Sequence, residues 1–304
     1  MRNPHTFEGA FVALVTPFIQ GKIDEEKYSQ LIAWHRASGM SGIVVCGTTG
    51  ETPTLQIEEQ ERLLQVAVQT AGNGLRVIAG TGSYSTEETI QRTRRAEKLG
   101  ADAALVVCPY YNRPTQEGLF LHFKTVAAST ALPIILYNLP SRTGVNLQPD
   151  TLARLVEACS NILAIKEGAG SLDQMSSMIA RCGPNFSLLS SDDNLTLPSM
   201  AVGAKGVVST IGNIVPSPIV LMTKLALAGD FEAARAIHFE LLALMSAAFL
   251  ETNPIPIKEA MEMLGIINAE FRLPLCRMGS DNRKELAKVV AGLKCDWPRE
   301  AATM

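Results

Sequence analysis

The sequence of 304 residues has little of what several classes of protein need. No apolar run reaches the eighteen residues typical of a membrane-spanning helix, and the first residues lack the apolar stretch of a secretion signal. Charged residues make up only 19% of the chain and the net charge is −3, so no basic surface for nucleic acid or an anionic membrane is indicated. We therefore expect a soluble, cytoplasmic protein with no nucleic-acid or membrane partner.

Cysteine and histidine are scarce and scattered. The six cysteines contain no C-x-x-C pair, and the four histidines form no H-E-x-x-H or similar cluster. In a chain without an export signal, such cysteines are expected to be reduced and mostly structural. We therefore expect neither a protein metal site nor a histidine-based catalytic triad.

The chain does contain a regular alternation of short apolar runs and helical patterns. Eight runs are predicted as strands, and each is followed by a predicted helix; the runs cover residues 10–15, 43–46, 77–79, 103–107, 134–137, 162–165, 187–189 and 206–209. Because the runs are continuously apolar, they fit a parallel sheet that is covered on both faces. Eight βα units in roughly 210 residues predict a closed (β/α)8 TIM barrel rather than a doubly wound sheet.

Only helical patterns follow the eighth run, from about residue 215 to residue 293. We predict two units, a catalytic barrel over residues 1–225 and a C-terminal helical extension over residues 226–304. No linker rich in proline, glycine and serine separates them.

One predicted strand ends in a lysine that is followed by an acid and a glycine-rich turn, Leu163-Ala-Ile-Lys166-Glu167-Gly-Ala-Gly170. The low-dielectric surroundings of a buried strand disfavour the ammonium form of a lysine and leave a free amine that can attack a carbonyl. Taken alone, Lys166 has a plainer interpretation, in which it reaches to the surface and pairs with a carboxylate.

Polar side chains gather where the predicted strands end, which is the face of a TIM barrel that carries the active site. Besides Lys166 they are Thr48, Thr49, Tyr110, Tyr111, Tyr137, Arg142, Asp192 and Asp193. Each has an ordinary structural explanation, such as a helix cap for a threonine or loop packing for a tyrosine. Their convergence on one barrel mouth favours a chemical role.

Schiff-base catalysis needs this combination of side chains. A lysine amine that adds to a ketone requires a nearby phenol or hydroxyl to move protons, and Tyr137 lies one strand away from Lys166. The backbone amides and hydroxyl groups of a Gly-Thr-Thr-Gly turn suit a small carboxylate, and the planar fork of Arg142 suits a second one.

Short motifs are spread over nearly the whole chain: Gly47-Thr-Thr-Gly-Glu51, Val77-Ile-Ala-Gly-Thr-Gly82, Pro109-Tyr-Tyr-Asn-Arg-Pro-Thr115, Tyr137-Asn-Leu-Pro-Ser-Arg-Thr-Gly144, Ile165-Lys-Glu167, Ser191-Asp-Asp193 and Asn253-Pro-Ile-Pro256. In this order they resemble the dihydrodipicolinate synthase (4-hydroxy-tetrahydrodipicolinate synthase) family. That family lies in the class I aldolase superfamily, with N-acetylneuraminate lyase.

The resemblance implies a catalytic set. Lys166 would form an imine with pyruvate, and Tyr137, Thr48 and Tyr111 would form a proton relay, with Tyr111 reaching in from a neighbouring subunit. The implied reaction is the condensation of pyruvate with L-aspartate 4-semialdehyde in the biosynthesis of lysine and diaminopimelate. The implied enzyme is a homotetramer, a dimer of dimers, that uses no metal or organic cofactor.

The resemblance also implies a substrate pocket. Thr49 and the adjacent backbone would hold the pyruvate carboxylate, Arg142 would receive the carboxylate of the semialdehyde, and the backbone carbonyl of Val208 would line the pocket. The alternative is another pyruvate-dependent class I aldolase or lyase, which acts on a 2-keto-3-deoxy sugar acid or 4-hydroxy-2-oxoglutarate. Such an enzyme would use Lys166 and Tyr137 as the synthase does. Arg142 and Tyr111 favour the synthase.

Two other classes of function fit less well. A dinucleotide-binding loop at Gly80-Thr-Gly82-Ser-Tyr-Ser85 lacks the third glycine, and no acid is suitably placed after a following strand. A catalytically silent barrel would be expected to lose the lysine or a tyrosine, and both are retained.

The chain departs from the family pattern after the seventh predicted strand. Ser191 stands where the family commonly has glycine, and we expect this serine to alter the pocket shape and modestly change specificity.

A second departure concerns feedback inhibition by lysine. Glu88 and Tyr110 match the allosteric lysine site of the family, but Ile57, Gln60 and Tyr84 replace its histidines or other polar residues. We therefore predict weak or absent inhibition by lysine.

Overall fold

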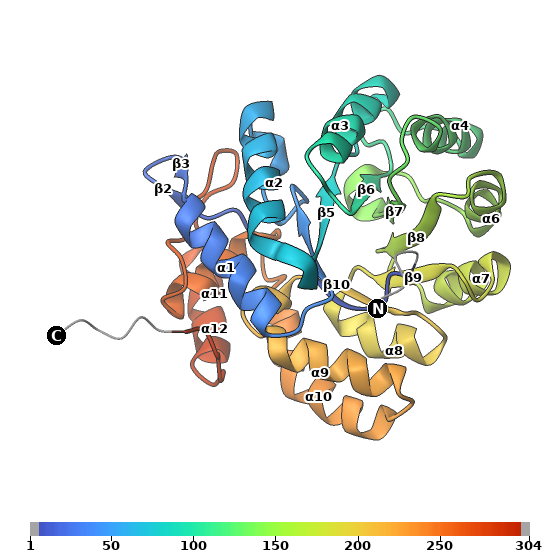
Figure 1. The fold of residues 1–304 in the computed structure, drawn as a ribbon. Coiled ribbons are helices and arrows are strands. Elements are labelled where there is room, and N and C mark those ends of the chain that lie inside the picture. Colours follow the sequence, from blue (N-terminus) through green and yellow to red (C-terminus); the bar gives the residue numbers. More distant parts are fainter. Residues whose placement is uncertain (1–5, 299–304) are drawn as a thin grey trace.

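A closed barrel of eight parallel strands forms the centre of this computed structural model, which describes residues 6–298 (Figure 1). The strands lie side by side in chain order, and the last pairs with the first. They are β1 (Gly9–Ala13), β4 (Gly42–Val45), β5 (Arg76–Gly80), β6 (Ala103–Val107), β7 (Ile134–Asn138), β8 (Ile162–Glu167), β9 (Ser187–Ser190) and β10 (Gly206–Ser209). The predicted TIM barrel is therefore confirmed.

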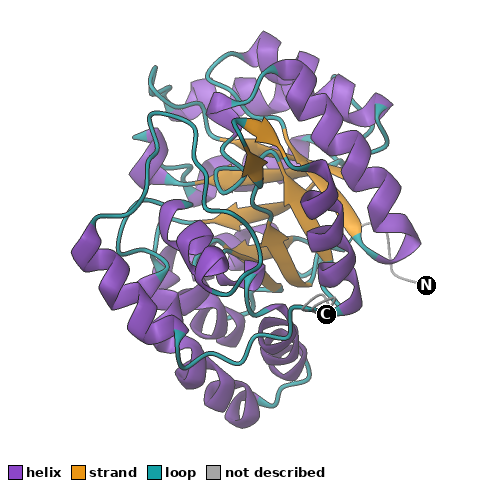
Figure 2. Ribbon diagram, turned by 90° about the vertical axis from the view of Figure 1, so that its left-hand side faces the viewer, coloured by secondary structure: helices purple, strands orange, loops and turns teal. Residues whose placement is uncertain are grey.

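Helices surround the barrel, with the strands at the centre of the view in Figure 2. They are α1 (Glu25–Ala37), α2 (Ile57–Ala71), α3 (Thr86–Lys98), α4 (Gln116–Ala127), α6 (Pro149–Ala158), α7 (Leu172–Cys182), α8 (Thr196–Ala201) and α9 (Pro216–Leu227), with the short α5 (Pro140–Thr143) after β7. Side chains at their N-termini fix where several of them begin; Asp24 accepts from the N–H of Lys27 at the start of α1. Within residues 6–298 no helix is long and apolar enough to cross a membrane.

Two apolar layers explain why the strands are continuously apolar. Side chains that face the barrel interior, such as Phe11, Ile135 and Ala164, form one buried cluster. Their neighbours along the same strands, such as Val12 and Ile165, face the helices and belong to a second and larger cluster. Both faces of each strand are thus buried, as in other parallel barrels.

The C-terminal part of the chain is only partly helical. Beyond α9 lie α10 (Phe231–Ala247), α11 (Ile255–Met263) and α12 (Ser280–Val290). The prediction of helix up to residue 293 was wrong for residues 264–279, which form no helix. Long-range contacts bind this segment instead, since Arg272 donates from its side chain to the Glu59 carboxylate and the carbonyl of Thr54. The division of the chain at residue 225 stays a prediction.

A small hairpin was also absent from the predicted elements. Strands β2 (Phe18–Ile19) and β3 (Lys22–Ile23) pair in antiparallel fashion. The two residues between them, Gln20 and Gly21, have φ values of 52° and 77°, as a tight two-residue turn requires.

Lys258 joins the C-terminal segment to the barrel from a fully buried position. Its Nζ donates to Glu51 Oε1 at 2.5 Å, to the carbonyl of Thr16 at 3.0 Å and to the carbonyl of Glu270 at 2.6 Å. Neither the Lys258 nor the Glu51 side chain is exposed. All three donors of the ammonium are thereby used, which is what a buried charge requires.

We expect Lys258→Met to lower the free energy of unfolding by about 3–5 kcal/mol, because the carboxylate of Glu51 would stay buried without its counter-charge. Urea unfolding at one fixed protein concentration measures the change. Lys284→Met is the matched control, since Lys284 pairs with Asp281 on the surface, and it should unfold like the parent. Equal stability of Lys258→Met and the parent would contradict this prediction.

Candidate active site

A cavity of about 690 Å³ opens at the C-terminal ends of the barrel strands. Among the residues that line it are Thr48, Thr49, Tyr110, Tyr137, Arg142, Lys166 and Asp192, all of which were predicted to gather at this mouth. Their elements are far apart in the sequence, and closure of the barrel brings them together.

Lys166 and Tyr137 lie side by side in the lining of the cavity. They are register partners on β8 and β7, so their side chains leave the sheet on the same face. The Lys166 side chain is only 6% exposed, and its Nζ lies 4.3 Å from the centroid of the Tyr137 ring. No carboxylate within residues 6–298 forms an ion pair with it, which argues against the plainer interpretation of a surface ion pair.

The hydroxyl of Tyr137 has a different partner from those expected. Its oxygen lies 3.4 Å from Ser191 Oγ, and no hydrogen bond to Thr48 or Tyr111 is found in the described part of the chain. Tyr111 is 92% exposed and does not line the cavity. Val208 is fully buried in the inner apolar cluster and is not among the lining residues either.

Asn253 connects the two predicted carboxylate-binding residues. Its side-chain Nδ2 donates to Thr49 Oγ1 at 2.9 Å, and its backbone carbonyl accepts from Arg142 Nη2 at 3.0 Å. Arg142 also donates to Thr252 Oγ1, and no described carboxylate pairs with its guanidinium. The Asn253-Pro-Ile-Pro256 motif pointed to this segment, but no pattern in the sequence predicted that Asn253 lines the cavity.

Comparison with known proteins places this chain in a family. The model described as "Dihydrodipicolinate synthetase family" matches residues 6–293. The chain belongs to this family. A 4-hydroxy-tetrahydrodipicolinate synthase from Thermodesulfovibrio yellowstonii is 50% identical over 289 residues, which cover 94% of this chain and 99% of that protein.

Solved structures of the dihydrodipicolinate synthetase family share the whole fold. The crystal structure of the dihydrodipicolinate synthase from Aquifex aeolicus has a TM-score of 0.92 and 49% identity, covering 94% of this chain and 97% of that one. A dihydrodipicolinate synthase from Acinetobacter baumannii, described as complexed with pyruvate, has a TM-score of 0.92 and 39% identity over 94% of this chain and 98% of its own.

The region that resembles the family's lysine site lies along the same cavity. The Glu88 carboxylate accepts from Arg92 Nη2 at 2.5 Å and from Ser83 Oγ at 2.5 Å, and the hydrogen bond from Ser83 is the main reason that the pKa of Glu88 is lowered. The rings of Tyr84 and Tyr110 meet edge to face with centroids 5.5 Å apart. The charge of Glu88 is therefore already balanced within this chain.

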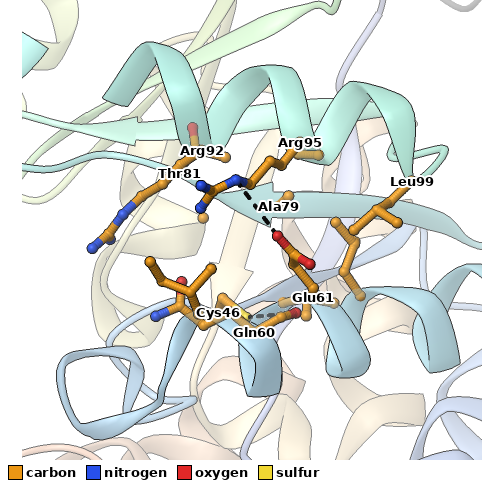
Figure 3. Close-up of a pocket in the computed structure, with 13 residues that line it drawn as sticks. Cys46, Gln60, Glu61, Ala79, Thr81, Arg92, Arg95 and Leu99 are labelled. Carbon is orange, nitrogen blue, oxygen red and sulfur yellow. Dashed lines mark hydrogen bonds and ion pairs between the residues drawn. The ribbon is translucent and has the colours of Figure 1, made fainter. Parts of the chain in front are cut away.

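A second pocket lies between α2 and α3 (Figure 3). Cys46, Gln60 and Arg92 line it, and Arg95 Nε lies 3.5 Å from Glu61 Oε1 in an ion pair beside it. Its volume of about 40 Å³ has room for little more than water.

Glu167 follows Lys166 in β8 and therefore faces the opposite side of the sheet in this family fold. Its fully buried carboxylate accepts from Asn138 Nδ2 at 3.0 Å and from the backbone N–H of Ala169 at 2.7 Å. Burial raises the pKa of Glu167 to about 7, although these hydrogen bonds oppose the rise. The carboxylate holds the turn that follows β8.

We expect this buried acid to make stability fall as the pH rises. Between the ordinary carboxyl pKa of 4.5 and about 7, the unfolded chain loses the Glu167 proton while the folded chain keeps it. The free energy of unfolding, relative to Glu167→Gln, should therefore fall by up to about 3 kcal/mol from pH 4.5 to 7 and level off above.

Urea unfolding of both proteins at a series of pH values measures this difference. Glu157→Gln, on the exposed part of α6, is the control and should follow the parent at every pH. Parallel stability profiles for Glu167→Gln and the parent would rule out the raised pKa.

Proposed function

We propose that this protein acts as a 4-hydroxy-tetrahydrodipicolinate synthase that condenses pyruvate with L-aspartate 4-semialdehyde in lysine and diaminopimelate biosynthesis. The observation that carries the proposal is the buried Lys166 amine beside Tyr137 at the barrel mouth. A relative that bears this name is 50% identical in sequence over 94% of this chain, which supports the proposal. The relative complexed with pyruvate supports pyruvate as the first substrate.

Imine formation accounts for the arrangement around Lys166. The Lys166 nitrogen adds to the ketone carbon, so a C–N bond forms as the C=O π bond opens, the nitrogen loses a proton and the oxygen gains one. The hydroxyl then takes up a second proton, the C–O bond breaks and water leaves, while the nitrogen lone pair forms the C=N bond of the protonated imine. Loss of a proton from the methyl group gives an enamine whose carbon attacks the aldehyde. In this proposal Tyr137 and Thr48 move the protons, and Thr49 holds the pyruvate carboxylate.

Arg142 is our proposed site for the carboxylate of the second substrate. Its guanidinium lines the cavity, and its hydrogen bonds to described residues, Thr252 and Asn253, both use Nη2, so the donors on Nε and Nη1 are available for a ligand. We also propose that the backbone carbonyl of Val208, on β10, lines the pocket when the substrate is bound. A sugar acid offers hydroxyl groups rather than a carboxylate at that place, which favours the semialdehyde.

Tyr111 supports an assembly of several chains. A tyrosine that is 92% exposed beside the mouth, but outside the cavity of its own chain, can complete the relay only in a neighbouring chain. Exposed Tyr84 and Ile57 add apolar surface to the same side of the barrel. We propose a homotetramer built as a dimer of dimers.

Reduction with borohydride in the presence of pyruvate should attach pyruvate to Lys166, and peptide mass spectrometry locates the adduct. We expect Arg142→Ala to trap pyruvate within about threefold of the parental rate, yet to lose about 100-fold in kcat/KM for the semialdehyde. The reason is that only the second substrate needs the guanidinium.

Arg154→Ala is the matched control, because Arg154 forms a surface ion pair with Glu117, and it should keep both activities. No adduct on Lys166 would remove the mechanism. Normal trapping with turnover of a 2-keto-3-deoxy sugar acid or 4-hydroxy-2-oxoglutarate, and none of the semialdehyde, would establish a different aldolase.

Initial rates should be insensitive to sub-millimolar L-lysine. The carboxylate of Glu88 is already paired with Arg92, so a lysine ammonium would gain little there. A steady-state assay with a lysine series tests this prediction, and Arg92→Leu should increase any response. Strong inhibition of the parent by sub-millimolar lysine would show that the prediction is wrong.

A further inference from the structure

Ser191 contacts the reacting part of the site, although the family resemblance assigns no role to its side chain. Its Oγ lies 3.4 Å from the hydroxyl oxygen of Tyr137, and within residues 6–298 this is the one hydrogen bond of that hydroxyl. We infer that Ser191 is a positioning residue for Tyr137, which holds the phenol beside Lys166 and stabilises it during proton transfer. This inference rests on the proposed imine chemistry.

The position of the serine hydroxyl is fixed by its surroundings. Ser191 is only 7% exposed, and its backbone N–H donates to the carbonyl of Glu167 on the neighbouring strand at 2.8 Å. A Cβ at Gly168 would lie 3.0 Å from Ser191 Cβ and 2.8 Å from Leu139 Cδ1, so a glycine is needed beside this serine. The hydroxyl therefore reaches Tyr137 from a rigid backbone.

The turn after β9 adds to this rigidity. Ser190 Oγ accepts from the N–H of Asp192 at 3.2 Å and donates to its carbonyl at 2.8 Å. The fully buried carboxylate of Asp193 accepts from the backbone N–H of Thr210 at 2.9 Å, which ties the turn to the end of β10. A hydroxyl on such a turn loses little freedom when it binds a partner.

The serine acts on Tyr137 when the phenol has given up its proton. Carbinolamine formation and dehydration require a proton to be delivered to the ketone oxygen and later recovered, so the phenol is transiently a phenolate. A hydroxyl that already points at this oxygen can donate to it as the charge develops, with no net gain or loss of protons. The contact lies within one chain, whereas the proposed contact with Tyr111 needs a neighbour.

Ser191→Ala and Ser191→Gly remove the hydroxyl, and alanine keeps the Cβ that packs against Gly168. We expect both variants to lose about fivefold in kcat and in the rate of borohydride trapping on Lys166. The KM for pyruvate should stay within about twofold, because the carboxylate contacts are untouched. A role in packing alone would change thermal stability or KM and leave the trapping rate unchanged.

Ser187→Ala is the matched control, at the first residue of β9, the strand that precedes Ser191. The Ser187 hydroxyl is buried and accepts one hydrogen bond, from the N–H of Phe7 at 3.3 Å, far from the cavity. This variant should keep the parental kcat and trapping rate.

Parental kinetics in Ser191→Ala, or a loss confined to KM, would overturn the inference. In either case the parent would still form the adduct on Lys166, so the proposed function would stand. Failure of the parent itself to form the adduct would overturn the proposed function, and the positioning role with it.

Discussion

The alternation of side chains along β8 is the constraint on which the active site depends. Lys166 faces the cavity because Ile165 and Glu167 face the helices, and a register shift by one residue would exchange them. The buried carboxylate of Glu167 accepts a hydrogen bond from the turn after the strand. A side chain on the outer face of β8 thus fixes the end of the strand whose inner face carries Lys166. The proposed nucleophile and the acid that binds the following turn thus occupy adjacent positions of one strand.

Much of the fold could be predicted because the barrel strands are buried on both faces, which leaves continuous apolar runs such as 103–107. The conformation of residues 264–279 could not be predicted, since it depends on contacts with residues such as Glu59 that lie far away in the sequence. The hairpin around Gln20 was missed for another reason, because strands of two residues are too short for any periodic pattern.

The candidate site was partly predictable in the same sense. Strand ends of a parallel barrel meet at one face, so the sequence positions of Lys166, Tyr137 and Arg142 were enough to bring them together. The hydroxyl contact between Ser191 and Tyr137 depends on side-chain direction and on the space left by Gly168, neither of which a sequence pattern contains. The proposed role of Tyr111 requires a second chain and stays a prediction.

The ion pair of Lys258 and Glu51 has a consequence for how the enzyme is made. The four groups that meet there come from Thr16, Glu51, Lys258 and Glu270, near both ends of the chain. While a ribosome is still synthesising the C-terminal third, the carboxylate beside the Gly-Thr-Thr-Gly turn has no counter-charge and must stay hydrated. The Gly-Thr-Thr-Gly turn, our proposed site for the pyruvate carboxylate, therefore gains its buried ion pair only once nearly the whole chain has been synthesised.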